Sequence, residues 1–106
     1  MKLPEPIEIY VGAENDGNVD AIDICFSPDA TVRDEGRVYE GLSAIKKWKA
    51  ASKEKYNHTM EPLEAVERDG RTIVASKVTG NFPGSPITIN FSFLLEGGKI
   101  LALETV

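Results

Sequence analysis

The chain has 106 residues, of which 42% are hydrophobic and 27% are charged, and its formal net charge is −5. This length has room for one domain, so we expect residues 1–106 to fold as a single unit, and the composition is ordinary for a globular protein. The acidic balance disfavours binding to nucleic acid and to anionic membrane surfaces, because both depend mainly on Lys and Arg.

Cys25 is the only cysteine in the chain. A single cysteine excludes an internal disulfide and a cysteine-rich zinc site, and it is typical of a reducing compartment. The N-terminus lacks the apolar core of a signal peptide, and no apolar run approaches the length of a membrane span. We therefore expect a cytoplasmic protein, in which Cys25 is a small apolar residue near a helix end.

The apolar residues nearest the N-terminus predict a first helix. Ile7, Tyr10 and Val11 fall on one face at helical spacing, and the prolines just before them suit a first helical turn. We expect this helix to run from about Pro6 to Glu14. A turn signal follows at residues 15–17, where the sequence is Asn-Asp-Gly.

A second helix is expected after this turn. Asn18 can cap it, because an asparagine side chain can accept a hydrogen bond from a free backbone N–H group. Pro28 is expected to end it, since proline lacks the N–H group that continues the helical ladder. The expected buried stripe of this helix consists of Val19, Ile22, Cys25 and Phe26.

The segment that follows predicts a small hairpin. Ala30–Asp34 has the residue types of a short strand, Glu35-Gly36 is a turn signal, and Arg37–Tyr39 is the expected partner strand. Two acids, Asp29 and Asp34, therefore lie five positions apart, at and near the two ends of the first of these strands.

Gly41 leads into a third predicted helix, from about Leu42 to Lys53. Its apolar stripe repeats every three residues, at Leu42, Ile45 and Trp48. We expect the lysines of this segment to form a solvated face opposite that stripe: Lys46, Lys47, Lys49, Lys53 and Lys55.

From His58 onward the sequence predicts strands and no helix. The strands expected are Thr59–Arg68, Thr72–Asn81, Ile87–Leu95 and Lys99–Val106, joined by a turn at Asp69-Gly70, a loop at Phe82–Pro86 and a turn at Gly97-Gly98. Strict alternation from Ile87 to Leu95 is the clearest strand signal in the chain. Helices first and a hairpin-connected sheet afterwards predict an α+β fold, with the helices packed on one face of the sheet.

The order and spacing of several motifs resemble the nuclear transport factor 2-like superfamily, in particular its SnoaL-like and ketosteroid isomerase-like branch. The resemblance covers nearly the whole chain and rests on Tyr10, the segment from Gly17 to Ile22, the strand from Asp29 to Asp34, Gly41 and the segment from Gly98 to Ile100. It implies a cone-shaped roll of three N-terminal helices on a curved, mostly antiparallel sheet. This fold hosts isomerases, cyclases, hydrolases, dehydratases and non-enzymes.

The resemblance also implies three catalytic residues. Asp34 matches the aspartate that moves a proton between carbons, and Tyr10 matches the tyrosine that donates to the substrate oxyanion. Asn90 stands where the isomerases have a protonated aspartic acid as the second oxyanion donor. An amide donates without a raised pKa, but it is a weaker acid and stabilises an enolate less well.

Each of these residues also has a purely structural interpretation. Asp34 could be a hairpin residue that pairs with Arg33, Arg37 or solvent, and Tyr10 could be a core tyrosine whose hydroxyl is satisfied. Asn90 can face a cavity only if the alternating apolar row from Ile87 to Leu95 lies on the outer face of the sheet. A monomer would then expose a large apolar patch. We adopt both the cavity position and a homodimer formed through that outer face.

Four further residues are expected to bind the ligand: Phe26, Trp48, His58 and Phe82. His58 is the only histidine and could act as a proton shuttle inside the cone. No metal site or cofactor is expected. Glu61, Glu64 and Glu67 advance by three along a strand, so they alternate between its faces and cannot converge on one ion.

The sequence favours two functions over a third, a protein-interaction module like the superfamily's transport factor, because no segment is marked as partner-binding. The first is a protein that binds an apolar, carbonyl-bearing small molecule and acts on it as a cofactor-independent isomerase, cyclase or related lyase with Asp34 as general base. The alternative is a non-catalytic ligand-binding or structural dimer of the same fold.

Overall fold

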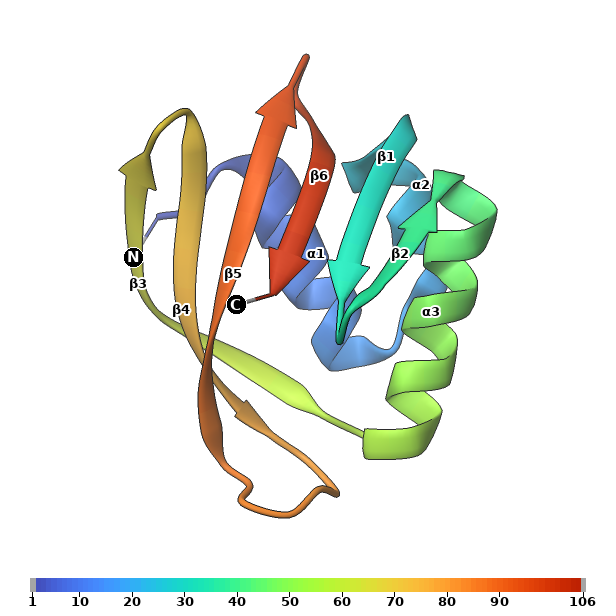
Figure 1. Ribbon diagram of the computed structural model, residues 1–106, viewed down its shortest axis with the longest axis vertical. Helices are drawn as coiled ribbons and strands as arrows, with labels where there is room; N and C mark the ends of the chain where they lie inside the picture. The colour runs from blue at the N-terminus through green and yellow to red at the C-terminus, as the bar shows by residue number, and fades with distance from the viewer. Residues whose placement is uncertain (1, 106) are drawn as a thin grey trace.

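The computed structural model describes residues 2–105, which form helices followed by a sheet, as the sequence predicts (Figure 1). The helical elements are α1 (Glu5–Asp16), a short 3-10 helix η1 (Val19–Ala21), α2 (Ile22–Cys25) and α3 (Gly41–Tyr56). The strands are β1 (Phe26–Asp34), β2 (Arg37–Glu40), β3 (Thr59–Arg68), β4 (Arg71–Thr79), β5 (Ile87–Glu96) and β6 (Lys99–Thr105). Val106, predicted to end the last strand, lies outside the described residues.

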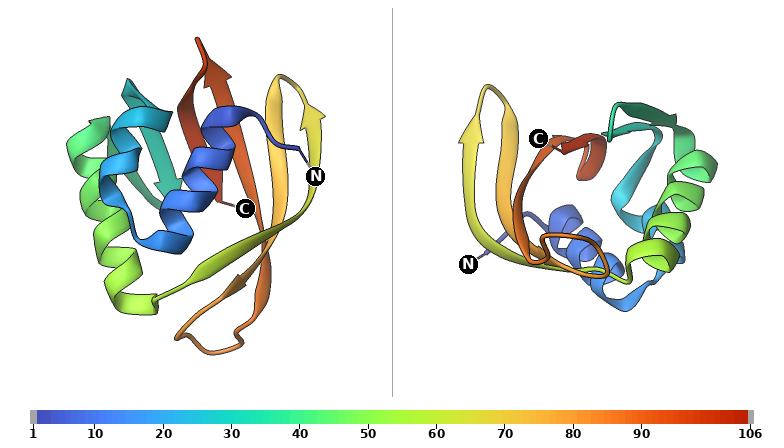
Figure 2. Two further views of the ribbon diagram at one scale, coloured as in Figure 1. Left: turned by 180° about the vertical axis from the view of Figure 1, so that it is seen from behind. Right: turned by 60° about the horizontal axis from the view of Figure 1, so that its bottom comes forward.

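The six strands form one sheet in the order β2-β1-β6-β5-β4-β3. The β1–β6 pair is parallel and every other neighbouring pair is antiparallel. The helices lie on one face of the sheet, which curls around them (Figure 2). This is the predicted α+β roll, and its concave side is where a cavity can form. No helix within residues 2–105 is long and apolar enough to cross a membrane.

The end of the second helix differs from the prediction. The helix stops at Cys25, so Phe26 begins β1, and Pro28 lies inside that strand. The pairing of β1 with β6 shifts register between Phe26 and Thr31. A proline is tolerated there because an interrupted ladder does not need its missing N–H group. Asn18 precedes η1 but forms no side-chain capping hydrogen bond.

The other helices are longer than predicted, and each ends at a residue in the left-handed conformation. α1 continues to Asp16 and is capped by Gly17, at φ 68°. α3 continues to Tyr56 and is capped by Asn57, at φ 45°. Glycine and asparagine adopt this conformation most readily, so these two residues set the helix ends.

One lysine of α3 is not on the solvated face predicted for it. Lys49 is 2% exposed, because it lies one turn after Ile45 on the same helix face, and that face packs against the inside of the roll. The solvated-face prediction for Lys49 is therefore wrong.

The apolar row of β5 lies on the inner face of the sheet, with Ile87 at its exposed end. Phe91 and Phe93 are buried, Ile89 packs against the core, and the alternating Asn90 is exposed on the opposite face. The rings of Phe26 and Phe93 contact Tyr10 edge-on, with centroids 5.9 and 5.6 Å from the Tyr10 ring. The prediction that Asn90 faces the cavity is wrong, because this row forms the core.

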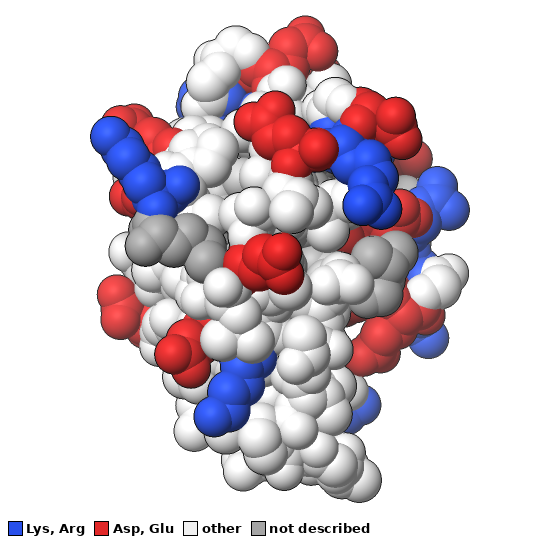
Figure 3. Space-filling view, turned by 90° about the vertical axis from the view of Figure 1, so that its left-hand side faces the viewer, with Lys and Arg blue, Asp and Glu red and all other residues white. Residues whose placement is uncertain are grey.

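This outcome removes the argument that tied a homodimer to an exposed apolar row. The homodimer stays a prediction, but the apolar residues from Ile87 to Leu95 are not its basis. Figure 3 views the side of the molecule on which β3 and β4 lie, and it shows acidic and basic side chains scattered over a broad uncharged area. Large exposed apolar side chains of β3 are Leu63, 51% exposed, and Val66, 40% exposed.

Candidate functional site

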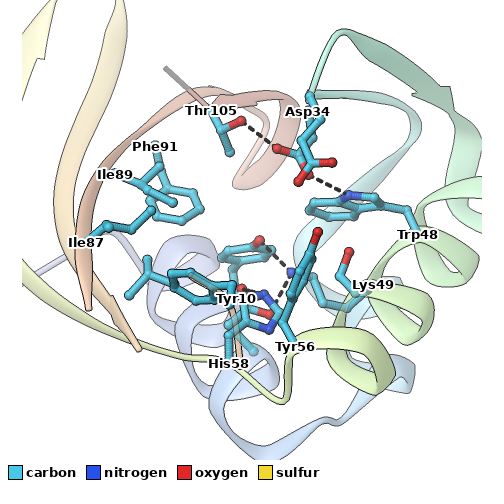
Figure 4. A pocket seen from close by; sticks show the side chains of 15 residues that line it. Tyr10, Asp34, Trp48, Lys49, Tyr56, His58, Ile87, Ile89, Phe91 and Thr105 are labelled. Atoms are coloured by element: carbon cyan, nitrogen blue, oxygen red, sulfur yellow. Dashed lines mark hydrogen bonds and ion pairs between the residues drawn. The ribbon is translucent and has the colours of Figure 1, made fainter. Parts of the chain in front are cut away.

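A cavity of about 210 Å³ lies between α1, α3 and the concave face of the sheet. Side chains from both ends of the chain line it, as Figure 4 shows. The lining residues are Tyr10, Glu14, Asp34, Glu35, Trp48, Lys49, Ser52, Tyr56, His58, Val78, Phe82, Ile87, Ile89, Phe91 and Thr105. A cavity of this kind, mostly apolar with a few convergent polar groups, is the usual form of a small-molecule site.

The polar and apolar groups occupy different parts of the cavity wall. Ile87, Ile89 and Phe91 point inward from β5, and Asp34 lies across the cavity from them beside Thr105 (Figure 4). A ligand in this space would have an apolar body against β5 and polar atoms toward the helices and the end of β1.

An open groove of about 390 Å³ adjoins the cavity along α3 and β2. The residues that line both spaces are Asp34, Glu35, Trp48, Ser52 and Tyr56. The groove therefore connects the polar end of the cavity with solvent.

Asp34 ends β1 and is held by two neutral donors. Its Oδ2 accepts a hydrogen bond from Trp48 Nε1 at 3.0 Å, and its Oδ1 accepts one from Thr105 Oγ1 at 2.6 Å. Arg33, a partner considered from the sequence, instead pairs with Glu104 on the other face of the sheet, at 3.6 Å. The Asp34 carboxylate therefore has a fixed orientation without a cation bound to it.

Beyond Asp34, the cavity contains a buried hydrogen-bonded chain of four residues. Lys49 Nζ donates to the Tyr10 hydroxyl at 2.9 Å and to Glu14 Oε1 at 2.7 Å. His58 Nε2 lies 3.0 Å from the other carboxylate oxygen, Glu14 Oε2. Lys49 Nζ also lies 4.1 Å from the centroid of the Trp48 ring. Burial and these short contacts make each of these polar groups dependent on its partners.

Burial and charge shift the pKa values of this chain in different directions. Burial raises the pKa of the Tyr10 hydroxyl well above its ordinary value, and Glu14 adds to the effect. Burial also opposes ionisation of Glu14, but the hydrogen bond from His58 and the charge of Lys49 prevail and lower its pKa to about 2. Burial lowers the pKa of Lys49, against the opposing effect of Glu14. Tyr10 thus stays protonated while Glu14 stays ionised.

The lowered pKa of Glu14 predicts a loss of stability in acid. The ionised form is favoured in the folded state, so its contribution is complete above the ordinary pKa of 4.5 and is lost as the pH falls toward 2. The shift corresponds to about 3 kcal/mol of unfolding free energy. Urea unfolding between pH 5 and pH 2 should show a clearly shallower decline in Glu14→Gln than in the wild type, whereas the exposed Glu5→Gln should behave as wild type. Equal slopes in Glu14→Gln and the wild type would contradict this prediction.

Glu14 and Lys49 are functional candidates that sequence reasoning missed. Their residue types are usually solvated, which is why neither was assigned to the core. A signal was present, because Glu14 lies four residues after Tyr10 and Lys49 lies four residues after Ile45. A charged residue that continues an apolar helical stripe points to a buried ion pair if two such residues occur on different helices.

Five of the seven predicted site residues line the cavity, and two do not. Trp48, His58 and Phe82 line the cavity with Tyr10 and Asp34. Phe26 is fully buried, packs against Tyr10 and does not line the cavity, and Asn90 is exposed away from it. Among residues 2–105, no group of three or more His, Cys, Asp or Glu side chains is arranged to hold a metal ion.

Comparison with known proteins assigns the fold and a family. The model of the SnoaL-like domain matches residues 7–102. A crystal structure from Sinorhizobium meliloti, of a protein provisionally assigned as a polyketide cyclase, is 38% identical with a TM-score of 0.93, and the match covers 98% of this chain and 95% of that one. No curated protein sequence matches the chain.

Two more distant structures share the fold. A protein from Catenulispora acidiphila with a ketosteroid isomerase-like fold, solved with trimethylamine, is 20% identical with a TM-score of 0.84, covering 99% of this chain and 86% of that one. A protein from Agrobacterium tumefaciens, provisionally assigned as a SnoaL-like isomerase, is 13% identical with a TM-score of 0.77, covering 95% and 92%.

Proposed function

This chain belongs to the SnoaL-like domain family, and we propose that it is an enzyme that moves a proton within a small apolar ligand bearing a carbonyl group. Asp34 would be the general base, and the Tyr10 hydroxyl would donate to the carbonyl oxygen. The products would be an isomer of the ligand or a ring closed within it. The observation that carries this proposal is the oriented carboxylate of Asp34, which faces an apolar wall across the cavity.

The surroundings of Asp34 suit a general base. Its two donors, Trp48 and Thr105, hold the carboxylate at the cavity without neutralising it, and the β5 side chains make the opposite wall apolar. A positioned carboxylate in such a site takes a proton from a carbon next to a carbonyl more readily than it could in water.

Tyr10 suits the oxygen end of the ligand. Its hydroxyl oxygen accepts a hydrogen bond from Lys49, so this bond does not use the hydroxyl hydrogen, and Tyr10 belongs to the wall of the cavity. Its raised pKa keeps that hydrogen in place at neutral pH. Donation to the carbonyl oxygen strengthens as negative charge develops there, and this difference lowers the barrier to proton removal.

The chemistry proceeds in two steps. Asp34 removes a proton from the carbon next to the carbonyl, and the electron pair of the broken C–H bond moves onto the carbonyl oxygen to give an enolate. The protonated Asp34 then returns the proton to another carbon, which isomerises the ligand. In a ligand with a second carbonyl, the enolate carbon can instead attack it and close a ring, with the proton delivered to the new alkoxide. The cyclase assignment of the Sinorhizobium meliloti relative supports this reaction class.

The test follows hydrogen–deuterium exchange next to the carbonyl in a panel of small ketones, measured by proton NMR in deuterated buffer. We expect saturable exchange above the buffer rate. Ser52→Trp, which places a large side chain at the junction of cavity and groove, should return the rate to that of buffer. Ser43→Trp, exposed on the same helix, should leave it unchanged.

Two results would contradict the proposal. One is exchange at the buffer rate for every ketone in the panel. The other is equal exchange in Ser52→Trp and Ser43→Trp, because it would place the reaction outside the cavity. A protein that binds ketones in the cavity without exchanging their protons would be the non-catalytic alternative.

A further inference from the structure

We propose that Lys49, together with Tyr10, forms the site that holds a negatively charged oxygen of the ligand. This inference rests on the proposed function, because it identifies the groups that stabilise the enolate oxygen formed when Asp34 removes a proton. Lys49 would also be the second hydrogen-bond donor to that oxygen. Asn90 cannot fill this role, because it is exposed on the other face of the sheet.

The hydrogen bonds of the two residues leave two hydrogens available. A lysine ammonium has three N–H donors, and Lys49 uses one on Tyr10 and one on Glu14. Its third N–H has no polar acceptor among residues 2–105. The Tyr10 hydroxyl accepts from Lys49 and keeps its own hydrogen. Because the two donor atoms are 2.9 Å apart, one ligand oxygen can lie within hydrogen-bond distance of both.

The surroundings of Lys49 strengthen its effect on a nearby anion. The side chain is 2% exposed, and a buried charge interacts more strongly with its neighbours than a solvated one. Its position is fixed by Glu14 and by the Trp48 ring, so little reorganisation is needed when charge develops on the ligand. His58 binds the second oxygen of Glu14 and thereby shares the negative charge that would otherwise oppose an anion beside Lys49.

This arrangement narrows the class of ligand. A cationic group next to Lys49 would be repelled, and a permanently anionic ligand would meet Asp34 at the same end of the cavity. A neutral carbonyl compound that becomes anionic only after giving its proton to Asp34 meets neither obstacle. The cavity therefore suits neutral ketones and related carbonyl compounds with an apolar body.

The probe for this site is 4-nitrophenol, a planar apolar ring whose ionised form is yellow. It should be tested with Asp34→Asn, because asparagine resembles the protonated Asp34 that is present beside the enolate. The pH is set so that half of the free probe is ionised. Adding the Asp34→Asn protein should then raise the ionised fraction of the probe, measured by absorbance. The nitrophenolate then stands in for the enolate oxygen.

Two variants made in the Asp34→Asn background test the role of Lys49. Glu14→Gln with Lys49→Met replaces the buried ion pair by neutral side chains of similar size, a change that proteins often tolerate. It should abolish the rise in ionised probe and weaken nitrophenolate binding about tenfold or more. Lys46 is on the same helix as Lys49, pairs with Asp23 of α2 and does not line the cavity. Lys46→Met is therefore the matched control and should keep the rise in ionised probe.

The outcomes separate this inference from the proposed function. The Lys49 site is wrong if the Asp34→Asn protein leaves the probe no more ionised than buffer does. It is also wrong if Glu14→Gln with Lys49→Met in that background still raises the ionised fraction of the probe. Ketone exchange that still depends on Asp34 would then leave the proposed function intact. If the wild type exchanges no ketone but Lys49 does control probe ionisation, the proposed function fails and the oxyanion site stands.

Discussion

Glu14→Gln alone is expected to lower the unfolding free energy by about 3–5 kcal/mol, because it leaves the buried Lys49 ammonium without its carboxylate. Lys49→Met alone is expected to cost less. It leaves Glu14 with a remaining polar partner, because His58 Nε2 lies 3.0 Å from Glu14 Oε2. Equilibrium unfolding in urea at neutral pH measures both values.

The double variant Glu14→Gln/Lys49→Met distinguishes an ion pair from two independent contacts. Replacing both charges removes the cost of an unpaired one, so the double variant should be more stable than Glu14→Gln alone. The coupling between the two sites should be on the order of 2–3 kcal/mol, near the upper end for residues in contact. Additive losses would show that the two side chains do not depend on each other, contrary to the 2.7 Å contact.

Much of the fold was predictable because local patterns determine it. Helical spacing in α1 and α3, turn residues at Glu35-Gly36 and Asp69-Gly70, and alternation in β5 each depend on residues close in sequence. The boundary at Phe26 was not predictable in this way. It depends on the parallel pairing of β1 with β6, a strand from the other end of the chain.

The error at Asn90 has a different cause. Alternation predicts the apolar row from Ile87 to Leu95 on one face, whereas the resemblance to the isomerases implies that Asn90 faces inward. The apolar row faces the core, because Phe91 and Phe93 are buried and the Phe93 ring packs against Tyr10. A strong two-residue period in a central strand shows which face of the sheet each side chain occupies. It is better evidence than a match to a catalytic position of the family at which this chain has a different residue type.

The site was predictable only in part. Asp34 and Tyr10 were identified through the family resemblance, and both line the cavity. Glu14 and Lys49 were missed because the evidence for their burial lies in packing, not in either residue's own sequence neighbourhood. Their pairing spans 35 positions along the chain and brings together α1 and α3.

Asp34→Asn is expected to lower the rate of ketone proton exchange by about 10²–10⁴-fold, the usual contribution of a general base. The amide keeps the size of the carboxylate and can still accept from Trp48 or Thr105, so the cavity should keep its shape. Ligand binding should therefore change much less than the rate. Asp29→Asn, an exposed acid in the same strand, is the matched control and should exchange at the wild-type rate.

The most direct measurement of the central claim is the exchange rate next to the carbonyl for wild type, Asp34→Asn and Asp29→Asn at saturating ketone. Loss of exchange in Asp34→Asn alone, with ketone binding retained, would establish Asp34 as the base that moves the proton. Equal rates in all three proteins would remove Asp34 from the chemistry.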